Sequence, residues 1–235
     1  GTSGVRVAII NQKKNILYTS SMKYSRGLEE WEDWLLCCQK LLTEIPKDMK
    51  KKLISCSIAG TSGTLLACTK NGVPLGKALP YSLSCPEYSK EINKLFIKDC
   101  PGSSISGSVG RAIKLINLYG NNIILRHQAD WISGWILDNW ESGEESNNLR
   151  MGWEISNKSW PKNFNNLNWL KCLPKIVSSG HILGSICNKK ATELNLPKNL
   201  QIIAGTTDSN AGVLAAFPNL DDGITILGST IVIKK

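Results

Sequence analysis

Short apolar runs alternate with polar turns along the chain, and several of these runs stop at a glycine followed by small hydroxyl residues. Residues 53–58, 201–204 and 224–227 are apolar and rich in β-branched side chains. Such runs, bounded by turn residues, are typical of buried β-strands, and glycine then permits backbone conformations that β-branched residues disfavour. The pattern therefore predicts glycine turns at strand ends.

Other segments show the spacing of helices. Residues 28–43 place apolar side chains near i, i+3, i+4 and i+7, with acidic residues in the opening turns, where a helix dipole favours them. We also expect helices over 108–119, 129–137 and 164–170, and a solvated loop at 47–52. Further strands are expected at 5–10, 16–19, 64–68, 73–81 and 123–125. This alternation predicts a mixed α/β fold.

The glycine turn occurs four times, as Gly1-Thr2-Ser3, Gly60-Thr61-Ser62, Gly205-Thr206-Thr207 and Gly228-Ser229-Thr230. One copy would be ordinary turn chemistry. Four copies at strand ends favour a binding role, because amides and hydroxyls beside glycine are donors for phosphate or a polyol. An apolar run resumes directly after the first, second and fourth copies, so we expect β-hairpin phosphate clamps. This differs from the strand-to-helix passage of a Walker loop.

The third copy leads instead into a segment of small residues and helix formers, which places Asp208 at a helix start. Two interpretations of Asp208 stay open. It could cap the helix, or it could accept the proton of a substrate hydroxyl and help to hold magnesium.

Composition narrows the function classes. The chain has 235 residues, 42% of them hydrophobic, which suffices for a large core. The formal net charge of +9 is spread along the chain without a basic groove, so we expect no nucleic-acid partner. Neither a membrane-length apolar run nor a signal peptide is visible. These features predict a soluble, cytoplasmic protein with no membrane partner.

The cysteines and histidines do not form a metal-binding pattern. Eight cysteines occur without a Cys-x-x-Cys pair, which is typical of buried thiols in a reducing compartment. His127 and His181 are the two histidines, and we expect His127 to be a packed or surface residue. Because no strand precedes Gly1, unlike the other copies of the turn, we also expect the natural protein to extend in both directions.

The residues resemble the FGGY carbohydrate kinases of the actin-like ATPase superfamily, and within them the short xylulokinase- or ribulokinase-like branch of cyanobacteria and plants. The resemblance spans nearly the whole chain in the family's order. It is carried by residues 1–6, 60–64, 129–133, 147–152, 204–211 and 227–230.

The resemblance implies an α/β, ribonuclease H-like domain with a mixed β-sheet and flanking helices. It implies ATP-dependent phosphorylation of a sugar, with ATP and Mg²⁺ as cofactors and D-ribulose or D-xylulose as substrate. Asp208 would be the catalytic base, a sugar contact and a water-mediated magnesium ligand, and Thr61 and Ser62 would contact the sugar. The implied phosphate-binding residues are Thr2, Ser3, Arg6, Gly228, Ser229 and Thr230.

The same resemblance implies that residues 1–235 are an N-terminal sugar-binding domain, truncated at its start and inactive alone, without the C-terminal ATP-binding domain. The family's aspartate before the first glycine is not within this chain. Ala59 and Gly143-Glu144 also depart from the usual Asp and Ser-Asp, which leaves the sugar open. A non-catalytic sugar-binding relative is the alternative function, and the sequence does not set the oligomeric state.

Overall fold

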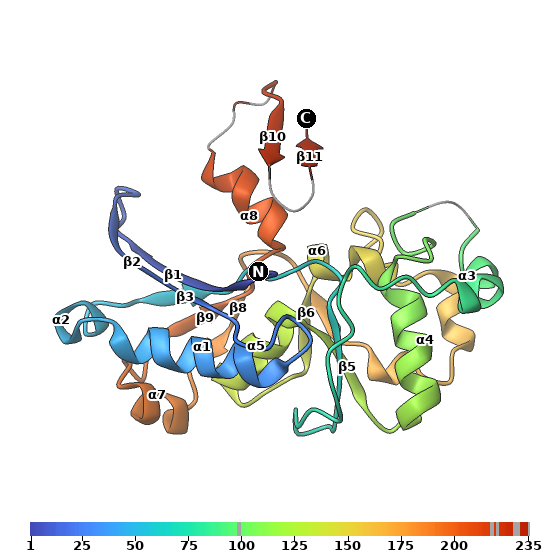
Figure 1. The fold of residues 1–235 in the computed structure, drawn as a ribbon, viewed down its shortest axis with the longest axis horizontal. Coiled ribbons are helices and arrows are strands. Elements are labelled where there is room, and N and C mark those ends of the chain that lie inside the picture. The colour runs from blue at the N-terminus through green and yellow to red at the C-terminus, as the bar shows by residue number, and fades with distance from the viewer. Residues whose placement is uncertain (98–99, 217–218, 220, 228–230, 235) are drawn as a thin grey trace.

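The chain folds into small β-sheets with helices packed around them (Figure 1). The computed structural model describes residues 1–97, 100–216, 219, 221–227 and 231–234. Gly228, Ser229 and Thr230 lie outside the described residues. The strands are β1 (Gly4–Ile10), β2 (Ile16–Lys23), β3 (Ser55–Ser57), β4 (Leu65–Cys68), β5 (Ile124–His127), β6 (Ser142–Glu144), β7 (Lys175–Val177), β8 (Ile182–Ser185), β9 (Gln201–Ile203), β10 (Ile224–Leu227) and β11 (Ile231–Lys234).

The strands pair mostly in twos. β1 pairs with β2, β4 with β5, and β10 with β11, all antiparallel, while β6 pairs with β7 in parallel. β9 lies between β3, its parallel neighbour, and β8, its antiparallel neighbour. The parallel pairing of β3 and β9 matters for function, because it brings the ends of two distant segments to one edge.

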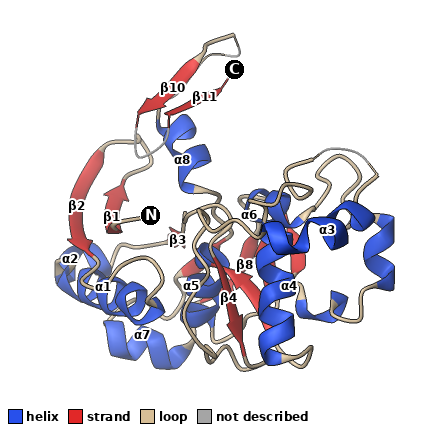
Figure 2. Cartoon of the chain, turned by 45° about the vertical axis from the view of Figure 1, so that its right-hand side comes forward, coloured by secondary structure: helices blue, strands red, loops and turns tan. Residues whose placement is uncertain are grey.

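Helices pack around these sheets, and one helix projects from the molecule together with a hairpin. They are α1 (Trp31–Glu44), α2 (Lys47–Lys50), α3 (Ser89–Leu95), α4 (Ser108–Tyr119), α5 (Gln128–Leu137), α6 (Glu145–Asn148), α7 (Asn188–Leu194) and α8 (Asp208–Ala215). Short 3₁₀ helices occur at Pro86–Tyr88, Leu149–Met151, Lys162–Asn166 and Leu170–Cys172. α8 and the β10–β11 hairpin stand out from the rest of the molecule (Figures 1 and 2).

Strand β4 divides the core into two apolar clusters. All four of its residues are buried, and successive side chains of a strand point to opposite faces. Leu66 and Cys68 pack with Trp34 and Trp131 in one cluster. Leu65 and Ala67 belong to the other cluster, which contains Phe164 and Trp169. β4 therefore joins the α1 half of the molecule to the α4 half.

Most of the expected elements are confirmed. The predicted helices over 28–43, 108–119 and 129–137 correspond to α1, α4 and α5, and α4 ends at Gly120, whose φ is 75°. The hairpins β1–β2 and β10–β11 also form where apolar runs predict them. The cysteines are free thiols, and burial raises the pKa of Cys56 to about 11.

Three local predictions are wrong. The Gly60 turn is not a hairpin, because β3 pairs with β9 whereas β4 pairs with β5. Residues 73–81 are not a continuous strand and only bridge β4, at Leu79 and Pro74. Residues 47–52 are not a solvated loop: they contain α2, and the buried ammonium of Lys50 donates to the carbonyl oxygens of Thr43 and Leu194, 3.0 and 2.8 Å away.

Candidate active site

Three of the four glycine turns meet at one place. The Gly60 N–H donates to the Thr206 carbonyl at 3.4 Å, and the Asp208 N–H donates to the Gly60 carbonyl at 2.8 Å. An Oδ2 atom of Asp208 lies 3.9 Å from the position that a Cβ on Gly1 would occupy. β3 and β9 are parallel neighbours, so the turns that follow them emerge at the same edge.

The carboxylate of Asp208 does not cap the helix that it begins. Asp208 is the first residue of α8, but the cap is Thr207, whose hydroxyl accepts from the Asn210 N–H at 3.2 Å. Asp208 itself is exposed. The interpretation of Asp208 as the helix cap is therefore wrong, because its neighbour fills that role.

The other predicted phosphate-binding residues lie on the first turn. Thr2, Ser3 and Arg6 are exposed, with Arg6 on β1. The Ser3 carbonyl accepts from the Tyr24 N–H at 3.0 Å, which extends the β1–β2 pairing toward the turn. Thr2 and Ser3 are thus surface residues that directly follow Gly1, which lies close to the Asp208 carboxylate. The other three predicted phosphate-binding residues, Gly228, Ser229 and Thr230, lie outside the described residues.

The second turn has one outward and one inward hydroxyl residue. Thr61 is 2% exposed, and its hydroxyl lies 2.7 Å from Thr64 Oγ1 and 3.0 Å from Gln128 Oε1. Ser62 is half-buried, and its carbonyl accepts from Arg150 Nη1 at 3.4 Å. The side chain of Thr61 is thus held inside the protein, and Ser62 is the better placed of the two to meet a ligand.

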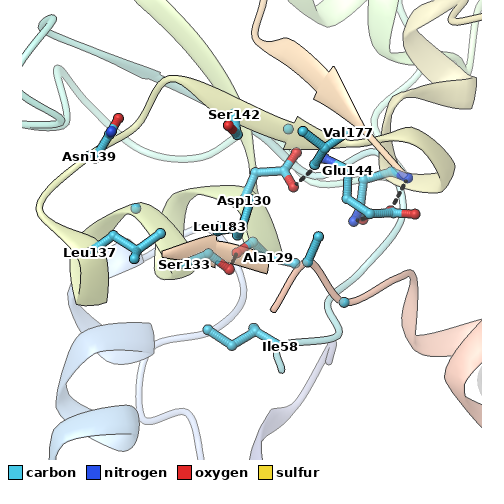
Figure 3. Close-up of a pocket in the computed structure, with 15 residues that line it drawn as sticks. Ile58, Ala129, Asp130, Ser133, Leu137, Asn139, Ser142, Glu144, Val177 and Leu183 are labelled. Atoms are coloured by element: carbon cyan, nitrogen blue, oxygen red, sulfur yellow. Dashed lines mark hydrogen bonds between the residues drawn. The ribbon is translucent and has the colours of Figure 1, made fainter. Parts of the chain in front are cut away.

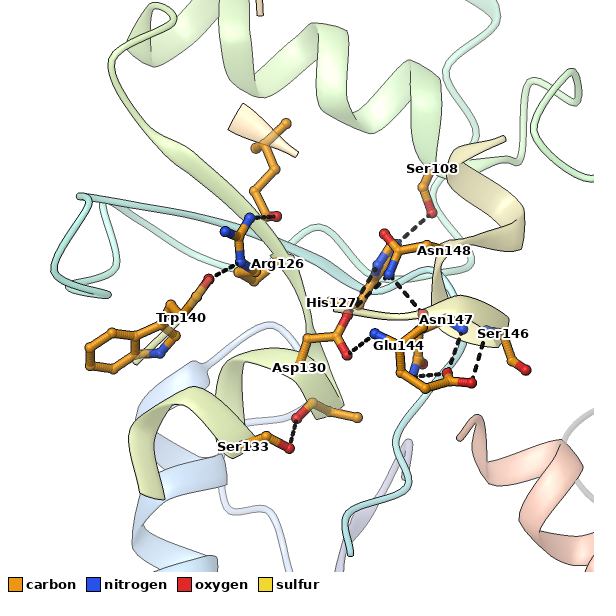
Figure 4. A network of polar contacts seen from close by, with 12 residues as sticks. Ser108, Arg126, His127, Asp130, Ser133, Trp140, Glu144, Ser146, Asn147 and Asn148 are labelled. Atoms are coloured by element: carbon orange, nitrogen blue, oxygen red, sulfur yellow. Dashed lines mark hydrogen bonds and ion pairs between the residues drawn. The ribbon is translucent and has the colours of Figure 1, made fainter. Parts of the chain in front are cut away.

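A buried polar network lies beneath these turns (Figure 4). Asp130 accepts from the Glu144 N–H at 2.9 Å and from Asn148 Nδ2 at 3.2 Å. Glu144 caps α6, because its carboxylate accepts from the N–H groups of Ser146 and Asn147, each at 2.9 Å. Glu144, which departs from the family pattern, therefore serves the fold.

His127 belongs to the same network and stays neutral. Its Nε2 lies 3.0 Å from Ser108 Oγ, and its Nδ1 lies 3.9 Å from Asp130 Oδ2. Burial, followed by the charges of nearby arginines, lowers the pKa of His127 to about 3. Burial also raises the pKa of Asp130 to about 7. The pair is therefore a neutral imidazole beside a carboxyl group, not an ion pair, over most of the acidic range.

Arg150 connects the second turn to the loop before α4, and Arg111 bonds to the same loop. Arg111 Nη2 and Arg150 both donate to the Ser106 carbonyl, and Arg150 also reaches Ser62. Gly63 has a φ of +91°, and a Cβ there would lie 3.0 Å from Arg111 Nη2. Burial lowers the pKa of Arg111 to about 10. Glycine is thus required at position 63, because other residues rarely adopt this φ and because a Cβ would crowd the Arg111 guanidinium.

Two hollows adjoin the site, and neither is suited to a sugar. One is a cavity of about 30 Å³, which has room for a water molecule only. Asp130, Ser133 and Glu144 are among its lining residues (Figure 3). A groove of about 1690 Å³ separates β1 from β3, but apolar side chains and strand edges form most of its lining. The polar turns at the end of this groove are therefore the candidate site.

Comparison with known proteins agrees with this architecture. No family model matches the chain. A 63-residue segment, 27% of the chain, is 36% identical to the putative sugar kinase YoaC of Bacillus subtilis (strain 168), of which it spans 13%. The fold resembles Plasmodium falciparum glycerol kinase, solved with ADP, at a TM-score of 0.82 and 15% identity over 98% of this chain and 52% of that chain.

A second solved structure gives the same result. Rhodospirillum rubrum xylulose kinase matches at a TM-score of 0.74 and 14% identity, over 92% of this chain and 50% of that chain. The chain has the fold of the matching half of these sugar kinases. It spans about half of the length of the kinase structures that it matches.

The folded structure brings residues to the turns that the sequence pattern did not identify. Gln128, Tyr24 and Arg150 contact the turns but come from distant segments, so no local spacing identifies them.

Within the described ranges, no group of three His, Cys, Asp or Glu side chains is arranged to bind a metal. In the same ranges, no helix combines the length and apolar character needed to cross a bilayer.

Gly205 offers a direct test of the turn geometry. A Cβ at this position would lie 2.0 Å from the Ile58 carbonyl oxygen, which is backbone and cannot swing away. We expect Gly205→Ala to lower the free energy of unfolding by about 1–3 kcal/mol, the usual cost of overpacking. Urea unfolding measures this loss. Gly223→Ala is the control, because a Cβ on Gly223 meets nothing within 4 Å; equal losses in both variants would contradict the predicted contact.

Proposed function

We propose that the full-length protein transfers the terminal phosphoryl group of ATP to a hydroxyl of a sugar, and that residues 1–235 form its N-terminal, sugar-binding domain. The resemblance to the FGGY kinases, and to their short xylulokinase- or ribulokinase-like branch, supports D-ribulose or D-xylulose as the sugar. The observation that carries the proposal is the exposed carboxylate of Asp208 next to the turns at Gly1 and Gly60.

Each described residue of the site takes a role that its position allows. Asp208 accepts the proton of the attacking sugar hydroxyl. Ser62 hydrogen-bonds the sugar, and Thr61 fixes the second turn from inside. The first turn, with Thr2, Ser3 and Arg6, binds the phosphates through amides, hydroxyls and charge, and Gly228, Ser229 and Thr230 complete it in the full protein.

The residues present also fit a magnesium ion that arrives with ATP. Mg²⁺ keeps several water ligands and is usually held by one or two carboxylates plus substrate phosphates. Exposed Asp208 would supply one such carboxylate, through a water ligand of the ion. When bound, the ion would neutralise phosphate charge, and the protein contributes positioning, on which loose phosphoryl transfer mainly depends.

A substrate panel tests the proposal. The full-length protein is incubated with ATP, Mg²⁺ and, separately, D-ribulose, D-xylulose, a hexulose and glycerol, and both ADP and phosphorylated sugar are measured. We expect a phosphorylated pentulose in equal amount to ADP. ADP without a phosphorylated acceptor would contradict a sugar kinase. Sugar binding without any ATP turnover would instead favour the non-catalytic sugar-binding relative.

A further inference from the structure

The amide of Gln128 connects two of the site's turns. Gln128 is the first residue of α5 and is 1% exposed. Its Oε1 accepts from the Thr61 N–H and lies 3.0 Å from the Thr61 hydroxyl, and its Nε2 donates to the Tyr24 hydroxyl at 3.3 Å. Every polar atom of this buried side chain therefore faces a residue next to a glycine turn.

The orientation of this amide follows from its partners. The Thr61 N–H can only donate, so the oxygen of Gln128 must face it and the NH₂ group must face Tyr24. Tyr24 in turn donates its backbone N–H to the Ser3 carbonyl at 3.0 Å. The first turn is thus linked to the second by hydrogen bonds at Tyr24 and Gln128, with the covalent side chain of Tyr24 joining its backbone N–H to its hydroxyl.

The path continues to Asp208. The Gly60 carbonyl, next to Thr61, accepts the Asp208 N–H at 2.8 Å. A Cβ on Gly60 would lie 3.2 Å from Gln128 Oε1 and 3.0 Å from the Ala129 nitrogen, so the turn is packed tightly onto the start of α5. A shift of the Gln128 amide would therefore move Gly60, and with it the segment that carries Asp208.

We propose that Gln128 is a positioning residue that sets the distance between the phosphate turn at Thr2–Ser3 and the acceptor side of the site at Ser62 and Asp208. The inference rests on the proposed function. Its chemical basis is that transfer between two bound molecules depends steeply on their separation, so that a displacement of about 1 Å can cost about 100-fold in rate. The alternative is that Gln128 merely satisfies the buried N–H of Thr61.

Amide hydrogen exchange distinguishes these two roles without requiring activity. Gln128→Met keeps the size of the side chain but removes its hydrogen bonds. Loss of protection at Thr61 is expected in either case, because Gln128 is its acceptor. Positioning further predicts faster exchange at Tyr24 and Asp208, whose amides bond to Ser3 and Gly60 and not to Gln128. Faster exchange at Thr61 alone would overturn the proposal.

Kinetics of the full-length enzyme supply the second readout. We expect Gln128→Met to lower kcat by about 10-fold or more, with little change in the KM for either substrate, because each still binds but in a poorer alignment. Gln128→Glu should recover most of the loss, since its second oxygen can accept a hydrogen bond from the Tyr24 hydroxyl. Failure of Gln128→Glu to recover kcat would count against the Tyr24 link.

Two further variants complete the test. Tyr24→Phe cuts the same path, so the loss in the double variant Tyr24→Phe/Gln128→Met should be smaller than the product of the single losses. Losses that simply multiply would overturn the proposal. Thr192→Ala is the control: it removes a side-chain hydrogen bond to the Asn188 carbonyl within α7, a helix that does not contribute to the site, and should leave kcat unchanged. If the wild-type protein transfers no phosphoryl group, the proposed function fails, and hydrogen exchange still tests Gln128.

Discussion

Replacing Asp208 by asparagine in the full-length protein should lower kcat by at least about 100-fold, the range that the loss of a general base produces. Asparagine has nearly the same shape, and Thr207 rather than Asp208 caps α8, so the helix start is preserved. The backbone bond from position 208 to Gly60 is also unaffected. The variant therefore removes the proton acceptor and leaves the turn in place.

Steady-state kinetics combined with calorimetric titration of the sugar would measure this effect. We expect the sugar to bind Asp208→Asn with an affinity close to that of the wild type, because the loss concerns the transition state. Asp48→Asn is the matched control, since Asp48 is also exposed in the first turn of a helix, α2, on another part of the molecule. Unchanged turnover in Asp208→Asn would end the assignment of Asp208 as the base.

The strands and glycine turns of this site were predictable because their signals are local. The apolar runs before Gly60 and Gly205 mark strands, and the helix formers after Asp208 mark α8. Parallel pairing of β3 with β9 then brings the two turns together. That pairing joins segments about 145 residues apart, from Ser55 to Gln201, so only the complete fold could reveal it.

The mistaken hairpin at Gly60 shows where local reasoning fails. Two apolar runs separated by a short glycine turn also suit two strands of different sheets. β4 is buried on both faces and pairs with β5, which places it between the two clusters of the core. Burial of the apolar strand β4 therefore outweighed its pairing with β3, the strand that precedes it in the sequence. The Gly60 turn connects two different sheets instead of forming a hairpin.

The polar network beneath the site was not predictable for a different reason. Glu144, Asn148 and Gln128 would each be ordinary surface residues by type. Their burial depends on partners contributed by other segments, such as Asp130 for Asn148 and Thr61 for Gln128. A sequence read alone gives the residue types but not these partners.

The buried pair of His127 and Asp130 makes a specific prediction about stability and pH. Relative to the unfolded chain, burial lowers the pKa of His127 from 6.5 to about 3 and raises that of Asp130 from 3.8 to about 7. Between pH 3.8 and 6.5, the folded pair then holds one proton, on Asp130, and the unfolded pair also holds one, on His127. Because stability changes with pH only where these numbers differ, the pair contributes no slope in this range.

Single variants should uncover two opposite slopes. In His127→Gln, the raised pKa of Asp130 acts alone, so stability relative to wild type should fall as the pH rises from 3.8 to 6.5, the range in which the wild-type pair contributes no slope. In Asp130→Asn, the lowered pKa of His127 acts alone, so relative stability should fall as the pH drops from 6.5 to 3.8. Each slope should approach about 1.4 kcal/mol per pH unit, the value for one proton.

Urea unfolding over this pH range measures both slopes, and the double variant His127→Gln/Asp130→Asn provides the control. With neither group able to titrate, its stability relative to wild type should again be flat between pH 3.8 and 6.5. Asp33 does not disturb the comparison, because hydrogen bonds from Arg26 and Ser25 lower its pKa to about 2 and it is present in every variant. Reversal of both slopes would mean that Asp130 has a lowered pKa and His127 a raised one in the folded protein, as in an ion pair across the contact at 3.9 Å.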